Sequence, residues 1–234
     1  MKRIITFLAL SAMLIPAVFT GCSRNNTADT GSAVATSAPT EAYYTDKNGV
    51  SYNLDPDGSL YISNFSGKTS ELNIPSDVKG KKIKRIGTSS LKMSKIKSVT
   101  IPDTVETIDD YAFAFSGNIE SVTIPDSVKT IGTSAFAGCA KLKSVNLSKN
   151  LTSIGMYSFD ATAVEKINIP KQVKEIKEYA FAECQKLKEI KINSKNTEFY
   201  KTTFNKSPNV TIIAPKDSKA IKTAKSNNIK YKIK

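Results

Sequence analysis

The chain has no histidine and no tryptophan in 234 residues, and after Arg24 its only arginine is Arg85. Without histidine, the serine–histidine and cysteine–histidine pairs of nucleophilic enzymes cannot form, and the usual zinc ligand sets are incomplete. We therefore predict that the protein is not an enzyme and that it holds no metal ion and no cofactor.

Lysine supplies almost all of the positive charge, and the formal net charge of the chain is +13. Lysine side chains attract anionic surfaces diffusely, whereas arginine is suited to bidentate recognition of phosphate. No nucleic-acid-binding motif accompanies the charge, so nucleic acid is not an expected partner.

The chain start has the pattern of an export signal. Lys2 and Arg3 precede an uncharged, mostly apolar run that ends at Phe19 and is shorter than the roughly 20 apolar residues of a membrane span. The residues up to Cys22 resemble a bacterial lipoprotein signal. The resemblance implies that residues 1–21 are removed and that Cys22 becomes a lipidated N-terminus. An ordinary cleaved signal with an unmodified cysteine is the alternative.

A polar segment follows, and with Cys22 it forms a predicted tether over residues 22–42. From Ser23 to Ala42 it has no aromatic residue and little hydrophobicity, so it cannot bury enough apolar surface to offset the entropy of ordering. Such a coil reaches about 25 Å. We expect it to hold a folded domain away from a membrane surface.

The rest of the chain repeats itself every 22 or 23 residues, a period typical of a solenoid. Each unit opens with a short alternating strand and an Ile-Pro pair, and each continues to an Ala-Phe pair whose phenylalanine is expected in the core. The opening pairs, some with substitutions, are Ile101-Pro102, Ile124-Pro125, Leu147-Ser148, Ile169-Pro170 and Ile192-Asn193. The corresponding phenylalanines are Phe113, Phe136, Phe159 and Phe181.

The two ends of the array differ from the repeats, as caps of a solenoid do. Asp55-Pro56-Asp57-Gly58 lies between two apolar runs and predicts a β-hairpin turn. Near the other end, Asp217 or Ser218 can cap a short helix, and the alternation from Ile229 to Ile233 predicts a final strand.

The repeat resembles the BspA-type leucine-rich repeat of bacterial surface proteins, with the approximate consensus L-x-x-I-x-I-P-x-x-V-x-x-I-G-x-x-A-F-x-x-C. The resemblance implies a mainly β repeat solenoid, a leucine-rich-repeat stack of short parallel strands with an N-terminal β-hairpin cap and a C-terminal helix-strand cap. We assign residues 43–71 to the first cap, residues 72–208 to the repeats and residues 209–234 to the second cap.

The resemblance also implies a function. We expect a cell-surface lipoprotein, held by its lipid on the extracellular face of a bacterial cell, whose solenoid binds a protein or polysaccharide ligand in adhesion or surface interaction. We expect it to be a monomer. The alternative is a structural or assembly scaffold within the bacterial envelope, without a host ligand.

Candidate partner-binding residues come from three columns of the repeat. Two columns are short, polar, outward-facing strand positions, and the third is a series of tyrosines before the Ala-Phe pair, where packing is the competing role. The strand candidates are Ser121, Thr123, Ser144, Asn146, Lys166 and Asn168, and the tyrosines are Tyr111, Tyr157 and Tyr179. A lysine-rich segment from Lys216 to Lys234 could attract an acidic polymer or serve as a solvated cap.

Two further patterns make structural predictions. Cys139 and Cys184 occupy one column two turns apart, about 9.5 Å, whereas a disulfide needs Cα atoms within about 7 Å, so both are expected to be unpaired. The column Lys97, Glu120, Lys143, Glu165 and Lys188 alternates in sign, so we expect neighbouring turns to form ion pairs.

Overall fold

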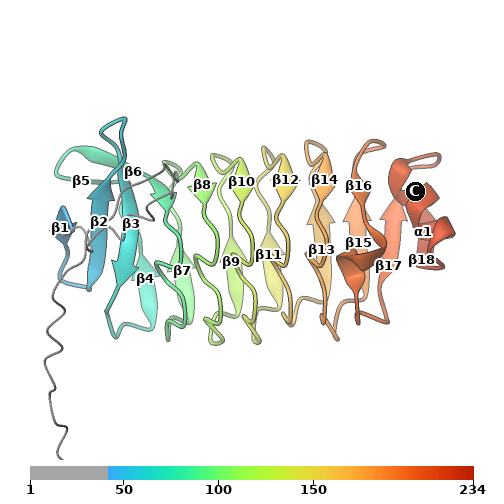
Figure 1. Ribbon diagram of the computed structural model, residues 1–234, viewed down its shortest axis with the longest axis horizontal. Helices are drawn as coiled ribbons and strands as arrows, with labels where there is room; N and C mark the ends of the chain where they lie inside the picture. Colours follow the sequence, from blue (N-terminus) through green and yellow to red (C-terminus); the bar gives the residue numbers. More distant parts are fainter. Residues whose placement is uncertain (1–41) are drawn as a thin grey trace, which may run out of the picture. The chain divides into compact units, whose positions relative to one another are not determined.

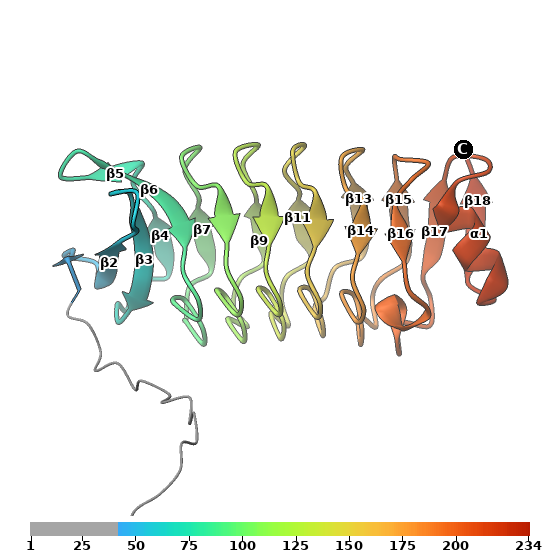
Figure 2. The ribbon, with the colours of Figure 1, turned by 45° about the horizontal axis from the view of Figure 1, so that its top comes forward.

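The structure, a computed structural model, describes residues 42–234 (Figure 1). These residues wind into a β-solenoid in which each regular turn contributes one short strand to each of two faces. Figure 2 shows the same stack of turns from a second angle. The predicted fold class is confirmed. The proposed signal peptide, the lipid site Cys22 and nearly all of the tether lie outside the described residues.

The first face is a ten-stranded sheet in the order β1-β2-β3-β6-β8-β10-β12-β14-β16, with β5 paired to β6. Its first three strands are antiparallel, and from β3 to β16 the pairing along this order is parallel. The strands are β1 (Tyr44–Thr45), β2 (Val50–Leu54), β3 (Leu60–Phe65), β5 (Asp77–Val78), β6 (Lys81–Ile86), β8 (Thr107–Ile108), β10 (Thr130–Ile131), β12 (Ser153–Ile154), β14 (Glu175–Ile176) and β16 (Glu198–Phe199).

The second face consists of three parallel sheets, β4-β7, β9-β11 and β13-β15-β17-β18. The strands are β4 (Glu71–Asn73), β7 (Ser98–Thr100), β9 (Ser121–Thr123), β11 (Ser144–Asn146), β13 (Lys166–Ile169), β15 (Glu189–Ile192), β17 (Thr211–Ala214) and β18 (Lys230–Ile233). The helical segments are the 3-10 helix η1 (Lys201–Phe204) and the α-helix α1 (Lys219–Ser226).

A continuous column of stacked phenylalanine rings runs through the core. The rings of Phe113 and Phe136 are 5.0 Å apart, and the next two intervals, to Phe159 and then to Phe181, are 5.4 and 5.3 Å. The column ends at Phe204, 6.1 Å further on. The three inner rings, Phe136, Phe159 and Phe181, therefore each pack between the rings of two other turns, which couples the folding of neighbouring repeats.

The corner that carries each Ala-Phe pair bends through left-handed backbone. Tyr111 and Phe115 have φ values of 58° and 59°, and Tyr157 and Ala161 have φ values of 54° and 52°. This region costs a non-glycine residue about 1–2 kcal/mol. The backbone N–H groups of Tyr111 and Phe115 donate to carbonyl oxygens of the next turn at 2.8 and 2.7 Å, so the stack itself stabilises the bend.

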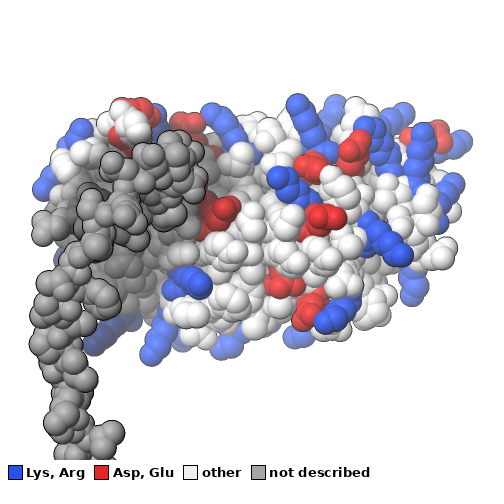
Figure 3. Space-filling model, in the orientation of Figure 1, with Lys and Arg blue, Asp and Glu red and all other residues white. Residues whose placement is uncertain are grey.

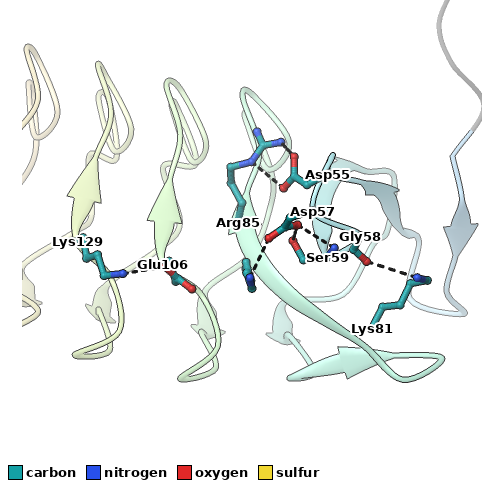
Figure 4. A network of polar contacts seen from close by, with 9 residues as sticks. Asp55, Asp57, Gly58, Ser59, Lys81, Arg85, Glu106 and Lys129 are labelled. Atoms are coloured by element: carbon teal, nitrogen blue, oxygen red, sulfur yellow. Dashed lines mark hydrogen bonds and ion pairs between the residues drawn. The ribbon is translucent and has the colours of Figure 1, made fainter.

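The N-terminal hairpin β2–β3 is joined to the repeats by Arg85 (Figure 4). Its guanidinium donates to both carboxylate oxygens of Asp55 and, at 2.5 Å, to Asp109, and it lies 4.2 Å over the ring of Tyr61. The two carboxylates hold the pKa of Arg85 above its ordinary value. Asp55 thus serves as a counter-ion that links the cap to the first turn.

A second hairpin, β5–β6, lies between the cap and the first regular repeat and was not predicted. Its two turn residues, Lys79 and Gly80, have φ values of 52° and 75°, the pair of positive values that a type I′ turn requires. The insertion makes the interval from Ile74-Pro75 to Ile101-Pro102 longer than the 22 or 23 residues that separate the later pairs.

The C-terminal cap follows the predicted pattern. Ser218 caps α1, and its hydroxyl accepts from the backbone N–H of Ile221 at 3.2 Å. Ala220, Ile221 and Ala224 bury one side of the helix against the last turns. Strand β18 then adds in parallel to β17 and ends the second face.

Ser158→Ala is expected to raise the free energy of unfolding by about 1 kcal/mol, because a buried hydroxyl without a partner is unfavourable. The Ser158 hydroxyl finds no partner within residues 42–234, and alanine fills the equivalent position at Ala135. Ser116→Ala is the control, since its hydroxyl donates to Leu91 O at 2.7 Å and should cost stability. Urea denaturation measures both, and equal losses in the two variants would contradict the assignment.

Candidate functional site

Outward-facing side chains of the second face align in rows because its strands are in register. Thr123 lies opposite Asn146 in the β9–β11 pair, and Asn168 lies opposite Lys191 in the β13–β15 pair. Strands β11 and β13 do not form a ladder. The predicted candidates Thr123, Asn146 and Asn168 therefore occupy one row that is interrupted between the two asparagines.

The interruption coincides with an irregularity in the sequence. The turn from Phe159 to Val164 is one residue shorter than the corresponding turn from Phe136 to Leu142. In the same repeat, Ser148 replaces the usual proline, and its buried hydroxyl donates to Val128 O at 2.6 Å. The shortened turn leads directly into β13. The face also divides between β7 and β9, where the turn from Phe113 to Ile119 has the regular length, so turn length alone does not account for the division.

On each side of the interruption, the asparagine side chain forms its hydrogen bond with a residue of its own sheet or of the turn that follows it, and not across the interruption. Asn146 Nδ2 donates to Thr123 Oγ1 at 3.4 Å, while Asn168 Oδ1 accepts from Asn193 Nδ2 at 2.6 Å. Asn193 Oδ1 in turn accepts from Lys234 Nζ at 2.5 Å. Within the described chain, Asn146 Oδ1 and Asn168 Nδ2 have no hydrogen-bond partner and are available to a ligand.

A groove of about 490 Å³ lies at this interruption, and we call it the asparagine groove. Leu147 and Pro170 contribute apolar wall, Val145 is a largely buried core residue beneath it, and the other lining residues carry amides or lysine ammonium groups. It is lined by Val145, Asn146, Leu147, Lys149, Asn168, Pro170, Lys171, Gln172 and Asn193. Such a surface can donate and accept hydrogen bonds and can attract negative charge.

The other polar strand candidates lie beside the groove. Ser121 and Ser144 face each other across β9 and β11 in the neighbouring row. Lys166 continues that row on β13 and forms an ion pair with Glu189 at 3.2 Å. The structure thus places all six strand candidates on one face, but only Asn146 and Asn168 line the groove.

The tyrosine candidates lie at the opposite corner of the turns and do not form one patch. Tyr157 and Tyr179 stack with ring centroids 4.8 Å apart and an interplanar angle of 4°. Ser134 occupies the equivalent position in the intervening turn, so Tyr111 is separated from this pair. Tyr157 and Tyr179 therefore pack against each other, while Tyr111 lies apart from them.

A more exposed apolar group was missed in the sequence. Met93 and Phe115 are 68% and 55% exposed, compared with 40% for Tyr111. The ammonium group of Lys92 lies 5.7 Å from the Tyr111 ring and 5.9 Å from the Phe115 ring. The sequence did contain a signal for this group. Phe115 is a large apolar residue at a position where the next repeat has Gly138, so its ring was not expected to be required by the core.

The alternating charge column forms fewer ion pairs than predicted. Lys188 and Glu165 pair at 3.1 Å, and this contact lowers the pKa of Glu165. No other neighbours in that column approach within ion-pair distance in the described part of the chain. Exposed pairs of this kind contribute only about 0–1 kcal/mol, so little holds the remaining side chains in a paired geometry.

Cys139 and Cys184 are buried and unpaired, as predicted. Their Sγ atoms donate to the carbonyl oxygens of Phe113 and Phe159 at 3.2 and 3.1 Å. Burial raises the pKa of the Cys139 thiol to about 12 and also raises that of Cys184. Both side chains fill the core at the corner of a turn.

A thiol reagent at pH 8 is expected to label neither cysteine quickly while the protein is folded, because the nucleophilic thiolate is scarce and enclosed. The measurement uses a Cys22→Ala variant, so that only these two thiols can react. Both should react at once in guanidinium chloride. Rapid stoichiometric labelling of the folded protein would contradict their assignment to the core.

Positive charge is concentrated in the C-terminal half of the solenoid. Residues 143–234 contain 19 lysines and eight acidic residues, whereas residues 42–142 contain 12 basic and 11 acidic residues. On the face shown in Figure 3, lysines gather toward the C-terminal end. The asparagine groove lies in this basic half.

Among residues 42–234 no three histidine, cysteine, aspartate or glutamate side chains come together as metal ligands would. No helix in the same range has the length and apolar character needed to cross a membrane.

Short parallel strands, two corners per turn and a stacked core define the class of this protein, which is a β-solenoid repeat scaffold. The chain belongs to the BspA type leucine-rich repeat family. The family's profile matches residues 17–120 and 106–230, with six copies of the repeat.

Two solved structures show the same fold. A leucine-rich repeat protein from Bacteroides ovatus is 29% identical with a TM-score of 0.66, and the match covers 73% of this chain and 47% of that one. This chain thus spans about half of that relative. The leucine-rich repeat protein of T. pallidum is 21% identical with a TM-score of 0.52, and the match covers 72% and 70% of the two chains. No curated protein matches the chain.

Proposed function

We propose that this protein is a lipid-anchored protein of the bacterial cell surface whose solenoid binds a protein or glycan partner. The observation that carries the proposal is the asparagine groove, where two amides from separate sheets present unused hydrogen-bonding atoms. A rigid repeat scaffold suits this role because its extended surface is fixed before a ligand arrives.

Membrane anchoring is supported by the residues that lead to Cys22, which resemble a lipoprotein signal. The test compares cells that express the full chain with cells that express Cys22→Ala. The native chain should sediment with membranes and be digested by protease added to intact cells. The variant should appear in the soluble exported fraction, and unchanged sedimentation of the variant would refute the anchor.

Partner binding is tested separately with the exported Cys22→Ala chain. We expect it to bind an extracellular-matrix protein, a mucin or a bacterial glycan, and the binding should persist in high salt. Exposed charges are screened beyond about 8 Å at physiological ionic strength, so binding through charge alone would disappear. Co-purification only with another envelope protein of the same cell would favour the scaffold role instead.

A further inference from the structure

We propose that the asparagine groove binds a linear polysaccharide whose sugars carry carboxylate groups. This inference rests on the proposed surface-binding function and specifies its ligand. Its basis is the combination, at one interruption of the sheet, of unpartnered amide atoms, the unpaired Lys171 and a lining without aromatic side chains.

The amides match sugar hydroxyls. Asn146 Oδ1 can accept and Asn168 Nδ2 can donate, and the two atoms belong to strands on opposite sides of the groove. A sugar hydroxyl is both a donor and an acceptor, so one hydroxyl-rich chain can satisfy both. Gln172 adds a third amide at the edge of the groove.

The lysines supply charge that the protein does not neutralise. Lys149 forms an ion pair with Asp126 at 3.1 Å, but Lys171 has no carboxylate partner among the described residues. Lys234 donates to Asn193 at the same groove, and its pKa is lowered by burial and then by the nearby charge of Lys191.

The shape of the site suits a chain rather than a single sugar. A second groove of about 580 Å³ adjoins the first, and both are lined by Lys171 and Gln172. The second groove continues around the corner of the turn toward Lys174 and Asn196. It is also lined by two carboxylates, each with a partner in the protein: Glu198 pairs with Lys219, and Glu175 accepts from the Tyr200 hydroxyl. A linear ligand can therefore pass over Lys171 and contact both grooves.

A protein partner fits this site less well. Interfaces between proteins are typically anchored by tryptophan, tyrosine or arginine, and none of these lines either groove. Phosphate polymers are also a weaker match, because planar bidentate recognition would use arginine and the basic groups here are all lysine. Carboxylates beside hydroxyls combine the two features that the groove presents.

The experiment uses the exported Cys22→Ala chain and isothermal titration at about 150 mM salt with three probes, namely an oligogalacturonate, a neutral malto-oligosaccharide of equal length and polyphosphate. We expect the oligogalacturonate to bind at least tenfold more tightly than either of the others. Equal binding of the neutral glycan would overturn the role of charge, and equal binding of polyphosphate would overturn the role of sugar hydroxyls.

Variants locate the site. Asn168→Ala and Lys171→Gln should each weaken oligogalacturonate binding at least fivefold, whereas Lys177→Gln should change it less than twofold. Lys177 is an exposed lysine of the same turn at the opposite corner, so the control removes the same charge. Equal losses from both lysine variants would show diffuse attraction and refute the groove.

The outcome also separates this inference from the proposed function. Salt-resistant binding of a protein or a neutral glycan, without binding of the oligogalacturonate, would refute the polysaccharide inference and leave the surface-binding function standing. Failure of every partner in both screens would refute both.

Discussion

Phe159→Ala should lower the free energy of unfolding by about 3–5 kcal/mol, the usual cost of removing a buried phenylalanine from a core. Phe159 is fully buried, with the rings of Phe136 and Phe181 at 5.4 and 5.3 Å on its two sides. The substitution would leave a cavity in the middle of the column, where neighbouring turns are already fixed by backbone hydrogen bonds. Urea denaturation followed by circular dichroism measures the loss.

The matched control is Phe115→Ala. Phe115 lies at the equivalent corner two turns earlier, but its side chain is 55% exposed. Its removal should therefore lower the free energy of unfolding by less than about 1 kcal/mol. If the two variants lost equal stability, the stacked column would not be the main source of cohesion between turns.

Arg85→Met should lower the free energy of unfolding by about 1–3 kcal/mol. The substitution keeps an apolar stem but leaves the carboxylates of Asp55 and Asp109, whose side chains are 18% and 16% exposed, without their counter-ion. Losing one member of a fully buried pair costs about 3–5 kcal/mol, and access of water reduces this value here.

The comparison for this variant is Lys84→Met, whose ion pair with Asp57 lies in solvent with side chains 38% and 54% exposed. Its effect on stability should be clearly smaller than that of Arg85→Met, because an exposed ion pair contributes little. Hydrogen exchange should show faster opening of β2 and β3 in Arg85→Met alone. Unchanged exchange in these strands would mean that Arg85 does not fasten the cap.

The regular part of the fold was predictable because the same residue types recur at a fixed spacing along the chain. Apolar residues such as Ile101 and Phe113 recur at positions that only a stack can bury, and the buried column of phenylalanines is the direct result. The caps were predictable from local chemistry, since Asp55 to Gly58 encodes a turn and Ser218 begins a helix.

The asparagine groove was only partly predictable. Asn146 and Asn168 were identified as outward-facing polar residues, but nothing in the repeat period indicated that β11 and β13 would belong to separate sheets. The second face divides both at a shortened turn and at a regular one, so periodicity does not report where strand pairing stops. The direction in which each amide pairs also depends on neighbours such as Asn193.

The column of alternating charges was also only partly predictable from the sequence. Alternating signs at Glu165 and Lys188 were sufficient to predict one ion pair. The pattern did not indicate which long side chains would remain solvated, because exposed ion pairs are worth too little to fix a geometry.

The most direct test of the binding account is a nuclear magnetic resonance titration of the exported Cys22→Ala chain with the oligogalacturonate. The account predicts saturable shifts of the side-chain amide signals of Asn146, Asn168 and Gln172 at physiological salt. Shifts that fall instead on Tyr157 and Tyr179, or that spread over the lysines without saturating, would contradict it.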